Sequence, residues 1–327
     1  MKRNLHAGRL RSGGLSLKVF TEDEIDDIHL ASLEVLERTG VFVEDDEALD
    51  IFSDGGCVVD REQHIAHIPP HLVEEAIRSA PPKVVMCGRD PRNDIVMEAG
   101  RVSFCNFDEG IMVVDLETGE HRQPSTADVA AIARLVDYLS DIDTYESAVG
   151  AADVPGETQC LHNTEAALNN TTKCVGTEAV SAWDVRKIVE MASLVVGGEE
   201  ELRERPIVGF GVCPVSPLKL PRDCTEVIIE TARFGLPDTI LSMAMAGGSS
   251  PVTLAGTLVT HNAEVLAGIT LSQLTERGAP VSYGSSTTAM DLRFAAASVG
   301  CPELALISAG AAQLARQYRL PSYIAGA

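Results

Sequence analysis

The fold of this chain is decided by three consecutive segments, which are TILSMAMA (239–246), VTLAGTLVTHNAEVLAGITLSQ (252–273) and PVSYG (280–284). The first and third are short apolar runs typical of buried strands, and the second is an Ala-rich helical segment. A helix of this length between two buried strands predicts a crossover that makes the strands parallel. The stretch therefore indicates an α/β fold with a parallel sheet.

The same alternation extends in both directions from this stretch. No Gly-x-Gly-x-x-Gly follows a first strand, so we favour a (β/α)8 TIM-type barrel over an open doubly wound sheet. The barrel is incomplete here, with about six strand–helix units. The strands are predicted at 144–151, 172–176, 207–213, 239–246, 280–284 and 322–326, and the helices at 125–139, 157–169, 182–196, 222–234, 252–273 and 302–318.

Residues 1–125 do not follow this alternation. Thr21 and Glu24 make a capping box that opens a helix ending near Gly40. The apolar runs at 57–59 and 65–68 predict a hairpin. We therefore expect two domains, an N-terminal α+β cap region at 1–125 and the partial barrel at 126–327.

Composition excludes several classes of protein. The chain has 26 Lys and Arg against 48 Asp and Glu, a formal net charge of −22, so nucleic acid is not an expected partner. The N-terminus lacks the apolar core of a secretory signal, and no apolar run is long enough to span a bilayer, so we expect a cytoplasmic protein that does not bind membranes. The eight cysteines include no CxxC pair and His64, His67 and His71 share no helix face, so neither disulfides nor a bound metal are expected.

The third and fourth predicted strands are followed by glycines, a thiol and hydroxyl groups. In a barrel, catalytic groups lie at these carboxyl ends of the strands. Cys213 and Ser216 follow the third strand and are predicted to bind substrate, although a Pro-rigidified turn with a buried thiol explains the same pattern. Gly247, Gly248 and Ser249 follow the fourth strand and are predicted to form a cofactor-binding turn. Such a turn binds an anion or leaves room for a large partner, and a plain barrel turn of small residues is the alternative.

The fifth strand concentrates hydroxyl groups at its tip. Tyr283 and Ser285 are predicted to be catalytic, and Ser286 and Asp291 to bind substrate. The ring of Tyr283 suits a cationic ligand, and Asp291 supplies negative charge. Tyr323, on the sixth strand, is a further predicted substrate-binding residue.

Glu264 is the third predicted catalytic residue. It lies one turn from His261 in an otherwise apolar helix. A buried carboxyl is costly unless it is paired, and such groups are typical of functional sites. A polar stripe along the helix is the alternative interpretation.

Several of these segments together closely resemble the trimethylamine:corrinoid methyltransferase family. The resemblance covers nearly the whole chain, and the family's (α/β)8 barrel agrees with the predicted units. It rests on GLP (235–237), SMAMAGGSSPV (242–252), LAGTLVTHNAEVL (254–266), YGSSTT (283–288) and PEL (302–304), and CPVSPL (213–218), Phe20-Thr21 and Gly88-Arg89-Asp90 also fit.

The resemblance implies transfer of a methyl group from trimethylamine to the Co(I) centre of a cognate corrinoid protein, as in methanogenesis from methylamines. The corrinoid (cobalamin) would be supplied by that partner, and no cofactor would be tightly bound by this chain. Some family members carry pyrrolysine, encoded by an amber codon, after a segment like 321–326. Because this chain ends at Ala327, we interpret it as truncated at the pyrrolysine position.

Two alternatives stay open. A relative without pyrrolysine would demethylate a quaternary amine such as glycine betaine, and the position after the sixth strand would separate the two types. The second alternative is that the chain is an inactive gene fragment. We also expect the protein to assemble as a homo-oligomer.

Overall fold

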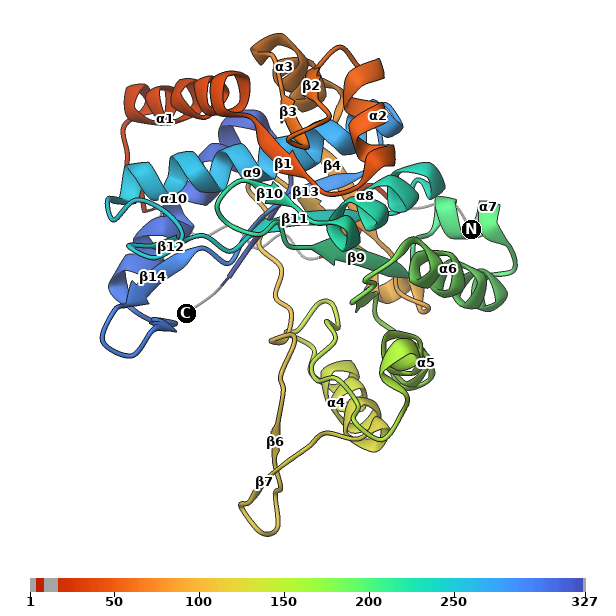
Figure 1. Cartoon of the computed structure of the whole chain (residues 1–327). Coiled ribbons are helices and arrows are strands. Elements are labelled where there is room, and N and C mark those ends of the chain that lie inside the picture. The colour runs from red at the N-terminus through yellow and green to blue at the C-terminus, as the bar shows by residue number, and fades with distance from the viewer. Residues whose placement is uncertain (1–3, 9–16, 326–327) are drawn as a thin grey trace. The chain divides into compact units, whose positions relative to one another are not determined.

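The computed structural model describes residues 4–8 and 17–325, and the chain forms two compact units. Unit 1 comprises residues 1–12, 85–97 and 101–211, and unit 2 comprises residues 13–84, 98–100 and 212–327. This division differs from the expected boundary at residue 125. In unit 2 the reason is helix α9 (Leu254–Thr275), because α1 (Glu22–Glu34) and α3 (Pro70–Ser79) pack against it (Figure 1).

Unit 1 contains a run of parallel strands. β8 (Val175–Thr177) pairs in parallel with β9 (Val208–Val212). The strand expected at 144–151 is present only as isolated bridges, because the neighbouring segment 101–112 is itself irregular. These parallel bridges join Cys105 to Thr144, Gly110 to Val149 and Tyr145 to Val175.

Three helices cover this part of the chain. α4 (Thr126–Tyr138) lies within the predicted helix 125–139, opens with a Ser125–Asp128 capping box and packs against α5 (Gln159–Asn170) (Figure 1). α6 (Ala182–Val196) has the predicted bounds and ends at Gly197 in the left-handed conformation. The remaining elements are β4 (Lys83–Met86), η2 (Pro91–Asn93), β5 (Ile95–Glu98), β6 (Val113–Val114), β7 (His121–Arg122), η3 (Gly156–Thr158) and α7 (Glu199–Glu204).

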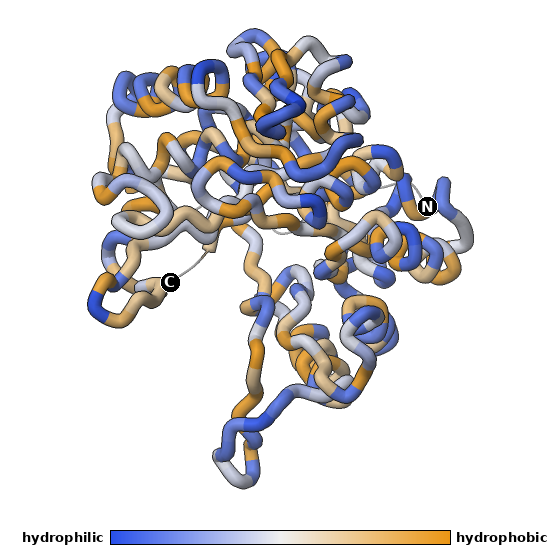
Figure 2. The backbone as a smooth tube through the Cα atoms, in the orientation of Figure 1, coloured by the Kyte–Doolittle hydropathy of each residue, from blue (hydrophilic) through white to orange (hydrophobic). Residues whose placement is uncertain are grey.

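The hairpin β6–β7 and the segment before it are unusually exposed. Figure 2 shows hydrophobic residues leading into β6, and Ile111 and Leu116 are 83% and 100% exposed. Val113 of β6 is an exception, because it packs against the buried cluster of Val129, Val149, Ala151 and Ala166.

Unit 2 contains a second group of parallel strands. β13 (Val281–Ser285) lies between β11 (Asp238–Ser242) and β16 (Ser322–Ile324), and both pairings are parallel. The predicted strand 239–246 is divided into β11 and β12 (Met245–Ala246), and β12 pairs with β14 (Thr288–Asp291). β14 turns back into β15 (Ala296–Ala297), a hairpin that hydropathy alone does not reveal.

Helix α9 is the centre of unit 2. It is apolar on all sides, as a helix buried in a core must be. Besides α1 and α3, it packs against α8 (Arg222–Phe234), α10 (Pro302–Tyr318) and strands β11 and β13. Across the described residues, no helix is both long and apolar enough to cross a membrane.

The N-terminal strands form a small mixed sheet in the same unit. β2 (Val58–Asp60) and β3 (Ile65–His67) make the predicted hairpin, and β1 (Val41–Val43) joins β3 on its other side. β10 (Lys219–Leu220) pairs in parallel with β1. The other elements here are the π-helical turn η1 (Val35–Thr39), which ends at Gly40, and α2 (Asp46–Asp54).

The α/β class with parallel strands is confirmed by these pairings. All eight cysteines lie outside disulfide bonds, four of them buried.

Candidate active site

Glu264 is held by three hydrogen bonds inside unit 2. Its carboxylate accepts from Ser216 Oγ at 2.8 Å, from the Leu218 backbone N–H at 2.9 Å and from Ser242 Oγ at 2.6 Å. The side chain is 1% exposed, and burial raises the pKa of its carboxyl while the three donors oppose that change. Glu264 therefore ties the loop 213–218 to the carboxyl end of β11.

His261 lies one turn before Glu264 and is neutral. Its Nδ1 is 2.9 Å from Thr287 Oγ1, which itself donates to the Ser242 carbonyl at 3.2 Å, so Nδ1 carries the imidazole proton. Burial lowers the pKa of His261 to about 3. The other nitrogen, Nε2, is buried and has no hydrogen-bond partner among the described residues, and the same holds for Ser285 Oγ at the end of β13.

Tyr283 points into the helix layer rather than toward a strand tip. Its hydroxyl donates to Asn262 Oδ1 at 2.9 Å, and Asn262 Nδ2 donates to the Tyr318 hydroxyl at 3.0 Å. The Tyr318 hydroxyl also lies 2.8 Å from His29 Nδ1. Because Tyr283 is 0% exposed, its ring offers no surface to a cationic ligand in this structure.

The glycine turn after β12 is explained by packing. Gly247 has φ of 82°, in the left-handed region. A Cβ at Gly248 would lie 2.4 Å from Met290 Sδ of the facing strand β14. Ser249 Oγ accepts from the Met245 backbone N–H at 3.0 Å, which closes the turn on itself.

The other predicted residues are only partly brought together. Ser286 donates its backbone N–H to the Ser242 carbonyl at 2.9 Å, and so lies beside the residue whose hydroxyl donates to Glu264. Cys213 is partly buried in the same loop as Ser216. Tyr323 on β16 pairs in register with Gly284 on β13. Asp291 stands apart at the end of β14, where it pairs with Arg293 at 3.4 Å.

The residues implicated in the pyrrolysine prediction, Gly326 and Ala327, lie outside the described residues.

Unit 1 holds a group of carboxyls that the sequence patterns did not single out. Asp108, Glu109, Glu146 and Glu178 come from three neighbouring parallel segments, and we call them the acidic cluster. The Glu109 backbone N–H donates to the Ser147 carbonyl at 2.9 Å, which sets the first segment beside the second. Glu178 directly follows β8, at the carboxyl end of that strand.

The negative charges of the four carboxyls in the acidic cluster repel one another. Burial, followed by the charge of Asp108, raises the pKa of Glu146 to about 8. Burial, followed by the charge of Glu109, raises the pKa of Glu178 to about 7. Burial also raises the pKa of Asp108 and Glu109. No pattern in the sequence predicts these shifts, because the four residues lie on three segments that share no motif.

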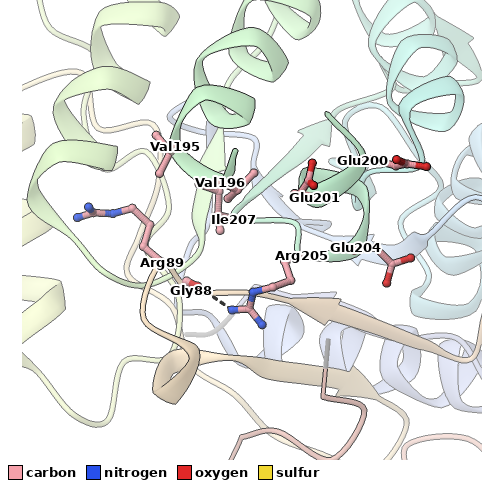
Figure 3. Close-up of a pocket in the computed structure, with 9 residues that line it drawn as sticks. All are labelled: Gly88, Arg89, Val195, Val196, Glu200, Glu201, Glu204, Arg205 and Ile207. Atoms are coloured by element: carbon pink, nitrogen blue, oxygen red, sulfur yellow. Dashed lines mark hydrogen bonds between the residues drawn. The ribbon is translucent and has the colours of Figure 1, made fainter. Parts of the chain in front are cut away.

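A cavity of about 550 Å³ lies elsewhere in unit 1, lined by residues of α6 and α7 and by Gly88, Arg89 and Ile207 (Figure 3). Ile207 directly precedes β9, so the cavity is at the amino end of that strand. Arg205 at its edge pairs with Asp94 at 2.7 Å and donates to the Gly88 carbonyl at 3.2 Å. These contacts are structural, and active sites of parallel α/β folds lie at the carboxyl ends of the strands rather than at their amino ends.

Known proteins similar to this chain are one-carbon transferases. The family described as "Trimethylamine methyltransferase (MTTB)" matches residues 3–327. The trimethylamine methyltransferase MttB of Desulfitobacterium hafniense (strain DSM 10664 / DCB-2) is 47% identical over 326 residues, covering 100% of this chain and 66% of the relative. MttB1 of Methanosarcina mazei is 45% identical, covering 99% of this chain and 67% of the relative.

More distant similarities agree on the fold. The glycine betaine methyltransferase of Desulfitobacterium hafniense (strain Y51) is 30% identical over 94% of this chain and 64% of its own length. The crystal structure of the Methanosarcina barkeri monomethylamine methyltransferase (MtmB) is similar with a TM-score of 0.53 at 14% identity, over 92% of this chain and 67% of that one. The chain thus spans about two thirds of the length of the relatives it matches. The match over almost the whole sequence shows that the chain belongs to the trimethylamine methyltransferase family.

Proposed function

We propose that the protein transfers a methyl group from trimethylamine to the Co(I) centre of a corrinoid carried by a partner protein. The observation that carries this proposal is the 47% identity to a trimethylamine methyltransferase over the full chain, against 30% to a glycine betaine methyltransferase. Glycine betaine demethylation is therefore the second candidate. The family and the similarity to MtmB further support a methyltransferase barrel of which these parallel strands form a part.

The reaction constrains what the protein must do. One N–CH3 bond breaks and one C–Co bond forms, with the electron pair of Co(I) making the new bond and the C–N pair staying on nitrogen. Nitrogen leaves as neutral dimethylamine only if the substrate nitrogen carries a fourth bond, such as a proton. The protein must therefore bind a cationic nitrogen, orient one methyl group and leave space for a large corrinoid.

We assign the group around Glu264 to positioning. The three hydrogen bonds that its carboxylate accepts all come from the protein itself, and they fix the loop 213–218 against β11. Ser285 and Ser286 would then present hydroxyl or backbone groups at the end of β13, beside the hydrogen bonds that Glu264 makes. The small residues Gly247, Gly248 and Ser249 suit a turn that a bulky partner group approaches.

A competition experiment tests the proposal. The protein at its natural length is mixed with a corrinoid protein reduced to Co(I) and with equal amounts of trimethylamine and glycine betaine. We expect trimethylamine to be consumed first, with one dimethylamine formed for each methyl-cobalt. Preferential consumption of glycine betaine would favour the second candidate, and transfer from neither would contradict the proposal.

A further inference from the structure

The acidic cluster is assembled by the backbone of unit 1. Parallel bridges align the segments that carry Asp108 and Glu109, Glu146, and the strand before Glu178. The carboxylate of Glu146 lies directly over Gly176, where an added Cβ would fall 1.7 Å from Glu146 Oε2. Thr144 Oγ1 donates to the other oxygen, Glu146 Oε1, at 3.1 Å. The carboxyls are thus held close to each other by strand pairing rather than by chance on a surface.

This cluster has no counter-charge among the residues that the structure describes. None of the four carboxyls forms an ion pair with a Lys, Arg or His in the part of the chain that the structure describes, and no such residue contributes to their pKa shifts. Four acidic groups gathered without a cation destabilise the fold unless protons or a bound cation offset their charge.

Two buried hydroxyls with unused hydrogen-bonding capacity border the cluster. Tyr145 is 1% exposed and Ser147 is 6% exposed, and neither hydroxyl has a partner at hydrogen-bond geometry among the described residues. Burial raises the pKa of the Tyr145 hydroxyl to about 12, the Ala148 backbone N–H opposes the rise, and the charges of Glu178 and Glu146 add to it. The Ser147 hydroxyl lies beside Glu178. Glu178 Oε1 is itself buried without a partner. Buried polar atoms in this condition are uncommon and indicate a missing ligand or water.

The spacing of these groups does not suit a metal ion. Within the described residues, no three His, Cys, Asp or Glu side chains converge as metal ligands. A larger cation, whose charge is spread over several atoms, does not need ligands that converge on one point, and so it fits these carboxyls better. Phe107, which directly precedes Asp108 in the sequence, is 77% exposed, and an exposed aromatic ring is a group that can contact an alkylammonium cation.

We propose that the acidic cluster of unit 1 is a binding site for a small organic ammonium cation, held by Glu146, Glu178, Asp108 and Glu109. The preference for positive charge follows from the cluster itself. The choice of a methylated ammonium, as substrate or product, rests on the proposed function.

Binding at this site is coupled to proton release. The titratable groups that face Glu146 and Glu178 are Asp108, Glu109, Tyr145, Cys160 and Cys174. With pKa values of about 8 and about 7, Glu146 and Glu178 still hold protons near neutrality. A bound cation favours their charged forms, so it displaces a proton and binds more tightly as the pH rises. While one proton is displaced, the affinity increases up to about tenfold per pH unit.

The probe for the test is tetramethylammonium chloride, whose charge does not change with pH, and the neutral control is tert-butanol. Isothermal titration calorimetry at pH 7, in two buffers of different ionisation enthalpy, gives the affinity and the number of protons released. We expect tetramethylammonium to bind with proton release and tert-butanol not to bind. Equal binding of the two probes, or binding that weakens from pH 6 to pH 8, overturns the proposal.

Three variants locate the site. Glu178→Gln and Glu146→Gln should each weaken tetramethylammonium binding at least tenfold. Gly176→Ala keeps every charge but displaces the Glu146 carboxylate, so it should weaken binding as well. The matched control is Glu165→Gln on the exposed face of α5, which should bind as the parent does. Thermal unfolding of each variant shows whether it is folded, and unchanged binding in the folded cluster variants overturns the proposal.

The two proposals fail in different ways. The binding assay needs neither corrinoid nor turnover, so cation binding without methyl transfer would leave the cluster assignment standing and contradict the proposed function. Methyl transfer in a protein whose cluster variants bind the cation normally would support the function and overturn the cluster assignment.

Discussion

At the scale of single residues, the structure shows that some of the predicted site residues support the fold through buried hydrogen bonds. Tyr283 is one of them, because its hydroxyl is used by Asn262 in the helix layer. Tyr283→Phe should lower the free energy of unfolding by about 1–2 kcal/mol, since a buried acceptor loses a donor. Methyl transfer should be nearly unchanged. Chemical denaturation and transfer rates measured on the same preparation check both, and a large loss of rate at normal stability would make Tyr283 catalytic.

His261 gives a second residue-scale prediction. Its pKa of about 3, lowered by burial, keeps the ring neutral across the physiological range. In NMR spectra its ring resonances should not titrate between pH 5 and pH 8. Because the unfolded ring binds a proton near pH 6.5 and the native one does not, His261 should reduce stability as the pH falls from about 6.5 toward 3, by up to about 1.4 kcal/mol per unit. A titration near pH 6.5 in the folded protein would show that the ring reaches solvent.

At the scale of elements, Glu264 fixes the loop 213–218 by accepting from one backbone and two side-chain donors. Glu264→Ala leaves those donors unpaired and should cost about 3 kcal/mol, whereas Glu264→Gln keeps one acceptor and should cost less. Hydrogen exchange of the Leu218 amide should become faster in the Ala variant and stay nearly unchanged in the Gln variant. If Gln also abolished methyl transfer without loosening the loop, Glu264 would have a role in the chemistry.

The sequence predicts the helices of this fold better than its strands. α6, α8 and α10 have the predicted bounds because each carries a start signal, such as Ser181 or Pro302, and an apolar stripe with helical spacing. The segment 144–151 and the hairpin β14–β15 differ because strands are defined by their partners, which lie far away in sequence. The acidic cluster was not predicted for the same reason. Glu264 was predicted as a site residue because a single carboxyl in an apolar helix stands out within one stretch of sequence.

At the scale of the whole molecule, the acidic cluster makes stability depend on pH. Native Glu146 and Glu178 keep protons up to about pH 8 and about pH 7, while the unfolded carboxyls lose theirs near pH 4.5. The native state therefore binds more protons over this range, and stability should fall as the pH rises, by about 1.4 kcal/mol per unit for one retained proton. Glu146→Gln should raise the melting temperature at pH 8 more than at pH 5. An equal change at both values would show that Glu146 is ionised in the native protein.

The central claim is that this member of the family demethylates trimethylamine. The most direct test is a single turnover with trimethylamine labelled with carbon-13 in its methyl groups, a stoichiometric Co(I) corrinoid protein and the protein at its natural length, followed by NMR. The account predicts a labelled methyl-cobalt signal and an equal amount of dimethylamine. Absence of that signal, under conditions where labelled glycine betaine produces it, would contradict the account.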